Sequence, residues 1–383
     1  MTQANGKCDT KFHELRALFD GFLRSGDELG ASICVNLDGE DVIDLWGGYT
    51  DASRSKPWTE DTIVNVFSCT KTVASLALLM LIDRRLVDPE ENVAKYWPEF
   101  ATRGKEGIKV RHILSHTSGM SALQKGTTLE DLVDFDKITS QLASQAPLWT
   151  PGTASGYHSW TFGFLIGAIV LRVTGISLRQ FIREEIAKPL EADFQVGAED
   201  KDWARISPVV PPPPTGETAA SDPDSIGTRT FANPVPDANF ANTESWRKAE
   251  IASANGHTNA RGLARILSVL ALGGTVNGRQ LLSPETIELI FQEQARGVDL
   301  VVGISLRFGI GYGLRGDGDT FVDGWLPSGR ICFWGGWGGS MAIVDLDRRL
   351  TIAYAMNKMS NTGLGNMAAK AYIQAVYRAL GIE

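Results

Sequence analysis

The spacing of apolar residues along the chain predicts several amphipathic helices and one buried helix. Residues 10–24 and 365–380 each carry an apolar stripe at helical spacing, so a helix is expected near both ends of the sequence. Residues 72–86 are apolar almost all the way round, which predicts a helix that is enclosed by protein on every side. Further helical patterns fall at residues 128–143, 160–174, 259–272 and 283–294.

Two pairs of segments rich in β-forming residues predict antiparallel hairpins. Residues 31–37 and 41–46 are separated by a three-residue turn, and residues 341–346 and 350–355 are separated in the same way. Helix and strands at both ends of the chain, with helices between them, predict the α+β fold class. We expect an antiparallel sheet that is flanked by the N- and C-terminal helices and interrupted by an inserted, mostly helical domain.

The length of 383 residues fits one large domain or two intergrown ones. The pattern assigns residues 1–85 and 300–383 to a split α/β domain and residues 86–299 to the helical domain. Eight of the 16 prolines fall within residues 208–236, here called the Pro-rich stretch. Because proline excludes a regular helix or a central strand, this stretch is predicted to be an extended loop. Two roles stay open for this loop, namely a wall of a substrate site or an insert on the protein surface.

The charge balance argues against polyanionic partners. Lys and Arg total 37 while Asp and Glu total 45, which gives a formal net charge of −8. An acidic chain is poorly suited to bind nucleic acid or an anionic membrane through bulk charge. The longest strongly apolar run, residues 73–82, is about half of the ~20 residues that a membrane span requires. We therefore expect neither a nucleic-acid partner nor a membrane partner.

The cysteines suggest a cellular compartment but no metal site. Scattered thiols without disulfide or zinc spacing are typical of a reducing environment, and no basic and apolar leader opens the chain, so a cytoplasmic protein is expected. The sequence also lacks HExxH, the phosphate-binding GxxxxGK[ST] and the EF-hand loop, so no metal and no cofactor are expected. The four cysteines are Cys8, Cys34, Cys69 and Cys332.

One Ser-x-x-Lys pair stands out by its context. The pattern occurs three times, but only Ser68 and Lys71 open the apolar helix predicted above. A spacing of three residues places both side chains on one helical face, and the helix N-terminus offers free N–H groups and a positive dipole end. These features suit a serine nucleophile with a basic partner. A capping serine beside a surface lysine fits the same spacing, so the pattern alone leaves both interpretations open.

Four motifs in order resemble those of the serine β-lactamase and penicillin-binding-protein superfamily. Residues 66–71 (VFSCTK) resemble its nucleophile motif, and residues 114–120 (LSHTSGM) resemble a structural stretch that follows it. Residues 149–152 (WTPG) and 157–159 (YHS) are similar to the second motif, and residues 334–336 (WGG) stand where β-lactamases carry Lys-Thr-Gly. The chain is most similar to the family VIII carboxylesterases, which are esterases built on the class C β-lactamase fold.

The resemblance implies catalytic roles for three side chains. Ser68 is implied as the nucleophile that becomes acylated, and Lys71 and Tyr157 as the partners that take and return its proton. The backbone N–H groups of Ser68 and Trp337 are implied as the oxyanion hole. Which of Lys71 and Tyr157 is the base stays open, because two coupled groups can titrate together. The residues implied at the substrate site are Ser159, Trp334, Gly335, Gly336 and Trp337.

Two positions depart from the β-lactamase pattern. Ser159 stands where the second motif has asparagine, and Trp334 replaces the lysine of the third motif. A β-lactam or peptidoglycan substrate carries a carboxylate that this lysine helps to hold, whereas an indole forms the wall of an apolar pocket. The resemblance therefore implies a serine carboxylesterase that cleaves small or medium neutral esters through a covalent acyl-enzyme on Ser68.

Other functions stay compatible with the sequence. An acyltransferase or transesterase uses the same residues and passes the acyl group to an alcohol or amine in place of water. A β-lactamase or D-peptidase is disfavoured by Trp334, and a non-catalytic binding protein is disfavoured because the implied catalytic residues are all present. The absence of GxSxG argues against an α/β-hydrolase. The expected partner is a small-molecule ester, and the oligomeric state is left open.

Several further residues in these motifs are interpreted as structural. His116 is expected to form structural hydrogen bonds rather than to act as the base of a catalytic triad. Trp149 and Trp160 are expected to pack in the core, while a place in an acyl or alcohol pocket stays open for both. Cys69 directly follows Ser68 and so points to a different helix face, which predicts a packing residue.

Overall fold

The computed structural model describes residues 3–214 and 222–382 of the chain. It confirms both predicted hairpins and the predicted helices, with ends that shift by a few residues. The apolar helix expected at residues 72–86 is α2 (Thr70–Asp83), which is buried along almost its whole length. The helix expected at residues 128–143 begins later, as α5 (Phe135–Ser144), because the Asp134 side chain accepts a hydrogen bond from a backbone amide there and caps the helix.

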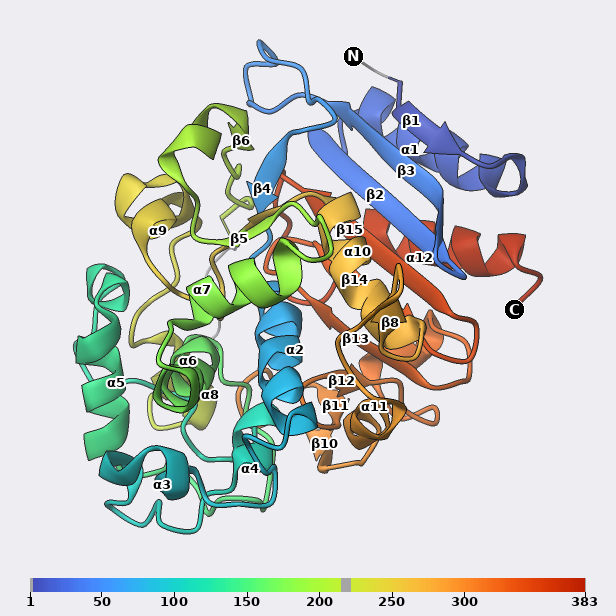
Figure 1. Cartoon of the computed structure of the whole chain (residues 1–383). Helices are drawn as coiled ribbons and strands as arrows, with labels where there is room; N and C mark the ends of the chain where they lie inside the picture. The colour runs from blue at the N-terminus through green and yellow to red at the C-terminus, as the bar shows by residue number, and fades with distance from the viewer. Residues whose placement is uncertain (1–2, 215–221, 383) are drawn as a thin grey trace.

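A large antiparallel sheet forms one half of the molecule (Figure 1). In the described residues its strand order is β1-β3-β2-β15-β14-β13-β12-β11-β10, so strands from both ends of the chain share one sheet. The two hairpins, β2–β3 and β14–β15, lie side by side because β15 pairs with β2. The strands are β1 (Asn5–Cys8), β2 (Gly30–Leu37), β3 (Glu40–Gly48), β10 (Ala295–Val298), β11 (Ser305–Phe308), β12 (Gly313–Leu314), β13 (Ile331–Gly335), β14 (Met341–Asp345) and β15 (Leu350–Met356).

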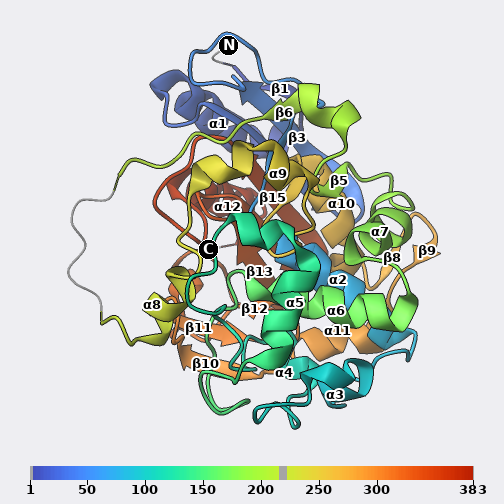
Figure 2. The ribbon, with the colours of Figure 1, turned by 90° about the vertical axis from the view of Figure 1, so that its left-hand side faces the viewer.

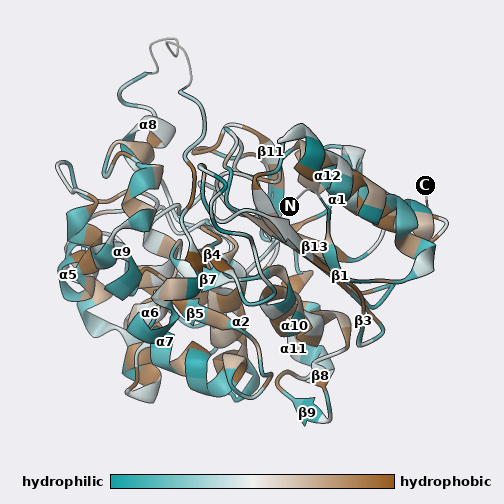
Figure 3. Cartoon of the chain, turned by 90° about the horizontal axis from the view of Figure 1, so that it is seen from above, coloured by the Kyte–Doolittle hydropathy of each residue, from teal (hydrophilic) through white to brown (hydrophobic). Residues whose placement is uncertain are grey.

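Helices cover both faces of this sheet (Figure 3). On one face α1 (His13–Ser25) and α12 (Met367–Ala379) pack against each other. On the other face α10 (Ala260–Ala271) packs against β2, β14 and β15, and α2 contacts both α10 and β13. The terminal helices thus flank the antiparallel sheet as predicted, and the α+β fold class is confirmed.

The remaining helices gather around α2. α6 (Thr161–Thr174) packs against α2 and α5, so α2 lies enclosed between the sheet and these helices. The domain boundaries at residues 86 and 300 stay a prediction; α10 falls between them in sequence and packs on the large sheet. Other elements are α3 (Val93–Tyr96), α4 (Val110–Leu114), α7 (Leu178–Phe181), the π-helical turn Ile182–Ala187, α9 (Glu244–Lys248), α11 (Pro284–Ile290), β8 (Thr275–Val276) and β9 (Arg279–Gln280).

A small sheet lies beside the start of α2 and sets the direction in which the chain enters that helix. Its strand order is β5-β7-β4-β6, and β4 pairs antiparallel with β7 and parallel with β6. Because β4 ends at Asn65, the residues that link it to α2 include Ser68. The strands are β4 (Ile63–Asn65), β5 (Phe194–Val196), β6 (Ile206–Ser207) and β7 (Gly256–Thr258).

The Pro-rich stretch contains a helix, α8 (Ile226–Phe231), so the prediction that it holds no regular helix is wrong. Apart from Pro223, its prolines gather at residues 208–214 and 234–236, which leaves the segment between them able to form a helical turn. The Ser225 side chain caps this helix by accepting a hydrogen bond from the Thr228 amide at 3.2 Å. Figure 2 shows α8 at the periphery of the molecule, and a methyl group added at its Gly227 would lie 2.8 Å from the Val301 carbonyl oxygen in the segment between β10 and β11. Residues 215–221 of the predicted loop lie outside the described residues.

The described residues contain neither a single helix suited to span a membrane nor a cluster of side chains suited to hold a metal ion. Among the described residues no single helix is long and apolar enough to cross a membrane, and only α6 taken together with Leu178–Ala187, bent by 76°, meets the criteria of length and composition. Within the same residues no group of three or more His, Cys, Asp or Glu side chains is arranged to hold a metal ion.

Candidate active site

Ser68 lies in a tight connection between the small sheet and α2. The Val66 amide donates a hydrogen bond to the Gly256 carbonyl at 2.9 Å, which continues the β4–β7 pairing to the edge of the connection. Phe67 then adopts φ of +42°, a left-handed conformation that is rare for a residue with a large side chain. Strained backbone of this kind is common at functional sites, and it persists because the surrounding contacts hold it in place. The reversal at Phe67 places Ser68 directly before the first turn of α2.

Lys71 contacts the Ser68 hydroxyl from the first turn of α2. Its Nζ lies 3.2 Å from Ser68 Oγ and donates hydrogen bonds to the carbonyl oxygens of Ser159 and Ser253, each at 2.8 Å. The lysine is 2% exposed, and none of its hydrogen-bond partners is a carboxylate. Burial disfavours the ammonium form and lowers the pKa of Lys71 well below its usual range. The neutral amine that results is able to accept a proton from Ser68.

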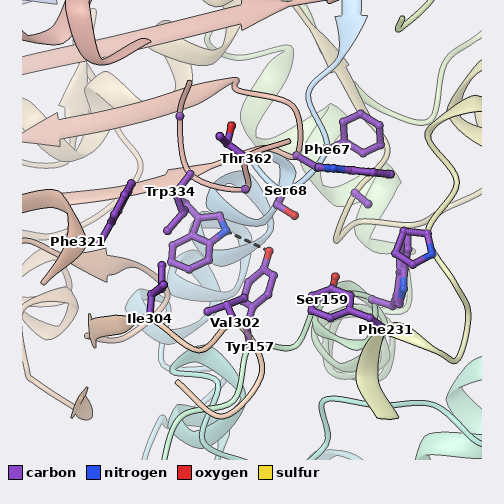
Figure 4. Close-up of a pocket in the computed structure, with 17 residues that line it drawn as sticks. Phe67, Ser68, Tyr157, Ser159, Phe231, Val302, Ile304, Phe321, Trp334 and Thr362 are labelled. Carbon is purple, nitrogen blue, oxygen red and sulfur yellow. Dashed lines mark hydrogen bonds between the residues drawn. The ribbon is translucent and has the colours of Figure 1, made fainter. Parts of the chain in front are cut away.

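The Tyr157 side chain also lies next to the Lys71 amine. Its ring lies under the Lys71 amine, with Nζ 4.8 Å from the ring centroid. The phenol oxygen accepts a hydrogen bond from the Trp334 indole N–H at 3.1 Å, drawn as a dashed line in Figure 4. Burial raises the pKa of Tyr157 above its usual range, while interactions with Ser68 and Trp334 lower it in part. Burial therefore favours the uncharged form of both groups.

Trp334 projects from β13 and stacks on Tyr157. The two ring centroids lie 5.0 Å apart with an interplanar angle of 35°. Phe308 and His116 lie on the same aromatic cluster, with centroids 5.4 Å and 6.0 Å from Trp334. These contacts fix the indole so that its only hydrogen-bond donor points at the phenol oxygen.

The turn after β13 brings Trp337 close to Ser68. A methyl group added at Gly336 would lie 2.2 Å from the Val66 carbonyl oxygen, so only glycine permits this approach. The Gly336 amide donates a hydrogen bond to the Ser340 carbonyl oxygen, and the Gly338 amide donates one to the Thr362 carbonyl oxygen, each at 2.8 Å. In the part of the chain that the structure describes, the amides of Ser68 and Trp337 donate no hydrogen bond. Two free N–H groups beside a serine hydroxyl suit an oxyanion.

The histidines near the site are structural. His116 Nδ1 accepts a hydrogen bond from the His158 amide at 3.1 Å. The His158 ring lies between the Gly156 carbonyl at 2.7 Å and the Ser118 hydroxyl at 2.6 Å, so Nδ1 carries its proton. Burial lowers the pKa of His158 to about 3 and that of His116 well below its usual range. Both rings are neutral, and the structural interpretation of His116 is confirmed.

Cys69 does not compete with Ser68 as a nucleophile. Its side chain is buried, its Sγ lies 3.9 Å from the Trp334 carbonyl oxygen, and burial raises the pKa of the thiol. A buried protonated thiol is a poor nucleophile. The packing role expected from the sequence is confirmed.

A cavity of about 520 Å³ opens next to Ser68 (Figure 4). Its described lining is mostly aromatic or aliphatic and contains no Asp, Glu, Lys, Arg or His. Phe231 and Pro236 reach it from the Pro-rich stretch, and Thr362 reaches it from the loop before α12. The lining residues are Phe67, Ser68, Tyr157, Ser159, Trp160, Phe231, Pro236, Ala254, Val302, Ile304, Phe321, Trp334, Trp337, Thr362, Gly363, Leu364 and Gly365.

Most of the residues that the motifs point to meet at this cavity. The side chains of Ser68, Tyr157, Ser159, Trp334 and Trp337 line it, and Lys71 lies behind Ser68. Gly335 and Gly336 do not line it; a side chain at either position would meet backbone atoms of neighbouring segments.

The motifs leave part of the cavity wall unpredicted. Trp160 is 6% exposed and packs as expected, yet it also lines the cavity. The segments that carry Phe231, Val302, Ile304 and Phe321 reach the cavity only through the tertiary fold, and no local sequence signal marks them.

Comparison with known proteins places this site in a family. The model of the Beta-lactamase family matches residues 15–377, so the chain belongs to the beta-lactamase family, and its resemblance to that superfamily is confirmed. Within that family it is similar to a crystal structure of a family VIII carboxylesterase, with 35% identity and a TM-score of 0.91 over 98% of this chain and 100% of the other.

Two curated relatives extend the comparison. The esterase/beta-lactamase LipL of Mycobacterium tuberculosis is 32% identical over 86% of this chain and 77% of its own length. The acyltransferase calJ of Penicillium decumbens is 24% identical over 83% of this chain and 81% of its own length. The chain is therefore similar both to a protein named as an esterase and to a protein named as an acyltransferase.

Proposed function

We propose that the protein is a serine carboxylesterase that cleaves small or medium neutral esters through an acyl-enzyme on Ser68. The observation that carries the proposal is the cluster of Ser68, Lys71 and Tyr157 at the wall of a cavity whose described lining bears no charged side chain. An uncharged acyl or alcohol group gains free energy when it is buried against these walls. A substrate carboxylate would lose hydration there without gaining a cationic partner.

Lys71 is the base in the acylation step. Its pKa is lowered by burial and its Nζ lies 3.2 Å from Ser68 Oγ, so the neutral amine takes the hydroxyl proton. As that proton leaves, Ser68 Oγ forms a bond to the ester carbonyl carbon, and the π electrons of the carbonyl move to its oxygen. The amides of Ser68 and Trp337 stabilise the oxygen anion, and loss of one such donor typically lowers the rate by about 10²–10³.

Tyr157 is the acid that releases the alcohol. Burial raises its pKa, so the phenol is protonated at neutral pH. When the tetrahedral intermediate collapses, the bond to the alcohol oxygen breaks, that oxygen takes the phenol proton, and the Lys71 ammonium returns a proton to the phenol oxygen. The indole N–H of Trp334 donates to that oxygen and stabilises its transient negative charge.

Water completes the cycle by the same route in reverse. Water gives a proton to the Lys71–Tyr157 pair while the water oxygen forms a bond to the acyl carbon. The bond from that carbon to Ser68 Oγ then breaks, and Oγ recovers its proton from Lys71. The product is the free acid, and the site returns to its starting protonation state.

Ester hydrolysis by the purified protein tests the proposal. We expect turnover of p-nitrophenyl acetate and butyrate, and a loss of at least about 10³-fold in kcat for Ser68→Ala. Ser53→Ala is the matched control, because Ser53 belongs to another Ser-x-x-Lys pair in an exposed loop. Full turnover by Ser68→Ala would refute the assignment of the nucleophile.

Acyl transfer is the second candidate function, and the similarity to the acyltransferase calJ favours it. The same acyl-enzyme forms in both reactions, and the difference lies in which acceptor reaches it first. With an alcohol acceptor added to the p-nitrophenyl butyrate assay, we expect free acid as the main product. A new ester as the main product would instead assign the protein as a transferase.

Hydrolysis of β-lactams is expected to be weak or absent. In the third motif Trp334 occupies the position of the lysine that helps to hold a β-lactam carboxylate, and the described cavity wall offers no cation. Nitrocefin turnover as fast as that of p-nitrophenyl butyrate would contradict this expectation.

A further inference from the structure

Asp299 is a buried carboxylate that contacts the active site only through the backbone. It is 1% exposed and lies at the end of β10, far in sequence from every motif. Its Oδ1 accepts hydrogen bonds from the amides of Tyr157 at 3.0 Å, Val301 at 2.9 Å and Val302 at 3.1 Å. Three N–H donors on one oxygen compensate the cost of burying the charge.

These hydrogen bonds join two parts of the site. Tyr157 supplies the phenol beside Ser68, and Val302 lines the cavity wall. The Leu300 amide adds a hydrogen bond to the Ser155 carbonyl at 2.9 Å, so two segments distant in sequence are held together next to the cavity. A shift of the Tyr157 backbone would move its phenol oxygen relative to both Ser68 and the Trp334 indole.

The hydrogen bonds of Asp299 use only one of its two carboxylate oxygens. Oδ2 is buried and accepts no hydrogen bond from any described residue. An asparagine would offer the same oxygen to the three amides without a buried charge, so holding the backbone does not by itself require a carboxylate. The negative charge of Asp299 lies close enough to Tyr157 to raise the pKa of its phenol.

We propose that Asp299 is a positioning residue for the reaction: by holding the Tyr157 backbone it fixes the phenol against Ser68, where the phenol acts as the acid of the acylation step. The inference rests on the proposed function, because it assigns Asp299 a part in the same proton transfer. The other titratable groups near the phenol are Lys71, His116 and Cys69. Burial favours the neutral form of all three.

Two substitutions test this positioning role of Asp299. Asp299→Asn keeps an oxygen for the three amides and removes the charge, whereas Asp299→Ala removes both. Asp83→Ala is the matched control, because Asp83 also accepts a backbone amide, that of Ser283 at 2.8 Å, at the far end of α2. At 1.5 Å per residue of helix, the control lies about 20 Å from Ser68.

The first readout is hydrolysis of p-nitrophenyl acetate. For Asp299→Ala we expect kcat to fall at least about tenfold with KM changed less than about threefold, because the small acyl group depends little on the cavity wall. For Asp299→Asn we expect kcat within about threefold of the wild type, because the amide oxygen still accepts the three backbone N–H groups.

The second readout is the rate at which a fluorophosphonate probe labels Ser68 across pH. It needs an activated Ser68 but no ester substrate, so it distinguishes a wrong assignment of the reaction from a wrong role for Asp299. We expect slow labelling of Asp299→Ala and labelling of Asp299→Asn at close to the wild-type rate. Labelling of Asp299→Asn as slow as that of Asp299→Ala would overturn the inference. So would an Asp299→Ala protein that folds and behaves like Asp83→Ala.

Discussion

The Trp334 indole N–H donates a hydrogen bond of 3.1 Å to the phenol oxygen of Tyr157. The β-lactamase pattern places a lysine at the position of Trp334, so here a neutral donor replaces a cation next to the phenol. An indole stabilises a transient phenolate through one hydrogen bond and adds a large apolar surface to the cavity. In the proposed mechanism, tryptophan at this position thus still supports the proton transfer and removes the charge that would attract an anionic substrate.

The first prediction concerns this hydrogen bond. Trp334→Phe keeps an aromatic ring and removes the N–H, which leaves the buried phenol oxygen without its donor. We expect kcat for p-nitrophenyl butyrate to fall about tenfold, which corresponds to about 1.4 kcal/mol and lies within the usual worth of one hydrogen bond. Trp203→Phe is the control, since it removes an indole N–H that donates to the Ala198 carbonyl away from the cavity. Equal kcat values for the two variants would contradict the role of Trp334.

The second prediction concerns Lys71 and pH. The proposed mechanism requires the neutral amine, so the acid limb of kcat/KM reports its protonation and is expected well below ~10.4, the usual pKa of lysine. Burial lowers the pKa of Lys71 in the folded state, so between the folded pKa and ~10.4 the unfolded chain binds one more proton than the folded chain. The free energy of unfolding therefore decreases as pH falls from ~10.4 toward the folded pKa.

Lys71→Met tests both consequences. We expect it to lose at least about 10³-fold in kcat and yet to unfold at a higher temperature than the wild type near pH 7, because an apolar side chain replaces a buried amine. The difference in melting temperature between variant and wild type should shrink as pH rises toward 10. A variant that is less stable than the wild type at every pH would refute the lowered pKa.

The third prediction assigns the Pro-rich stretch a role in selectivity. Phe231 lies at the end of α8 and lines the cavity, so its truncation to alanine opens space at the wall. We expect Phe231→Ala to raise kcat/KM for p-nitrophenyl octanoate relative to acetate by about tenfold, the scale of one or two buried methylene groups. Val235→Ala is the control in the same stretch, because Val235 is 67% exposed and does not line the cavity. An unchanged chain-length profile would leave the stretch without a part in selectivity.

The fourth prediction concerns the proposed oxyanion hole. A side chain at Gly336 would collide with the Val66 carbonyl and displace the turn that carries the Trp337 amide. We expect Gly336→Ala to lower kcat by about 10²-fold or more with a smaller effect on KM, as for the loss of an oxyanion donor. Gly21→Ala makes the same chemical change within α1, where a methyl group meets no atom within 4 Å. If Gly336→Ala folds and retains full kcat, the close approach at Gly336 is not required for catalysis.

The motifs predicted most of the residues that meet in the proposed catalytic part of the site, because these residues lie within short, ordered segments. Ser68 and Lys71 are three residues apart on one helix, and Trp334 and Trp337 share one turn, so local spacing already indicates their proximity. Local spacing does not predict the Trp334–Tyr157 hydrogen bond, because that bond depends on how β13 packs against the segment before α6.

The wall of the cavity and its support were not predictable for the same reason. Phe231, Phe321 and Asp299 belong to three segments that meet only in the folded chain. Phe321 and Phe231 look like ordinary aromatic residues in sequence, and Asp299 like an ordinary surface carboxylate. The short α8 was also missed, because the high proline content of the stretch as a whole concealed a proline-free segment capped by Ser225.

The most direct test of the account is to trap the acyl-enzyme and locate it. The protein is mixed with p-nitrophenyl butyrate, quenched in acid within the first turnovers, digested and analysed by mass spectrometry. The account predicts a butyryl group on the peptide that contains Ser68, attached at that serine, and its complete absence in Ser68→Ala. A butyryl group on another side chain, with p-nitrophenol still released at the wild-type rate by Ser68→Ala, would contradict it.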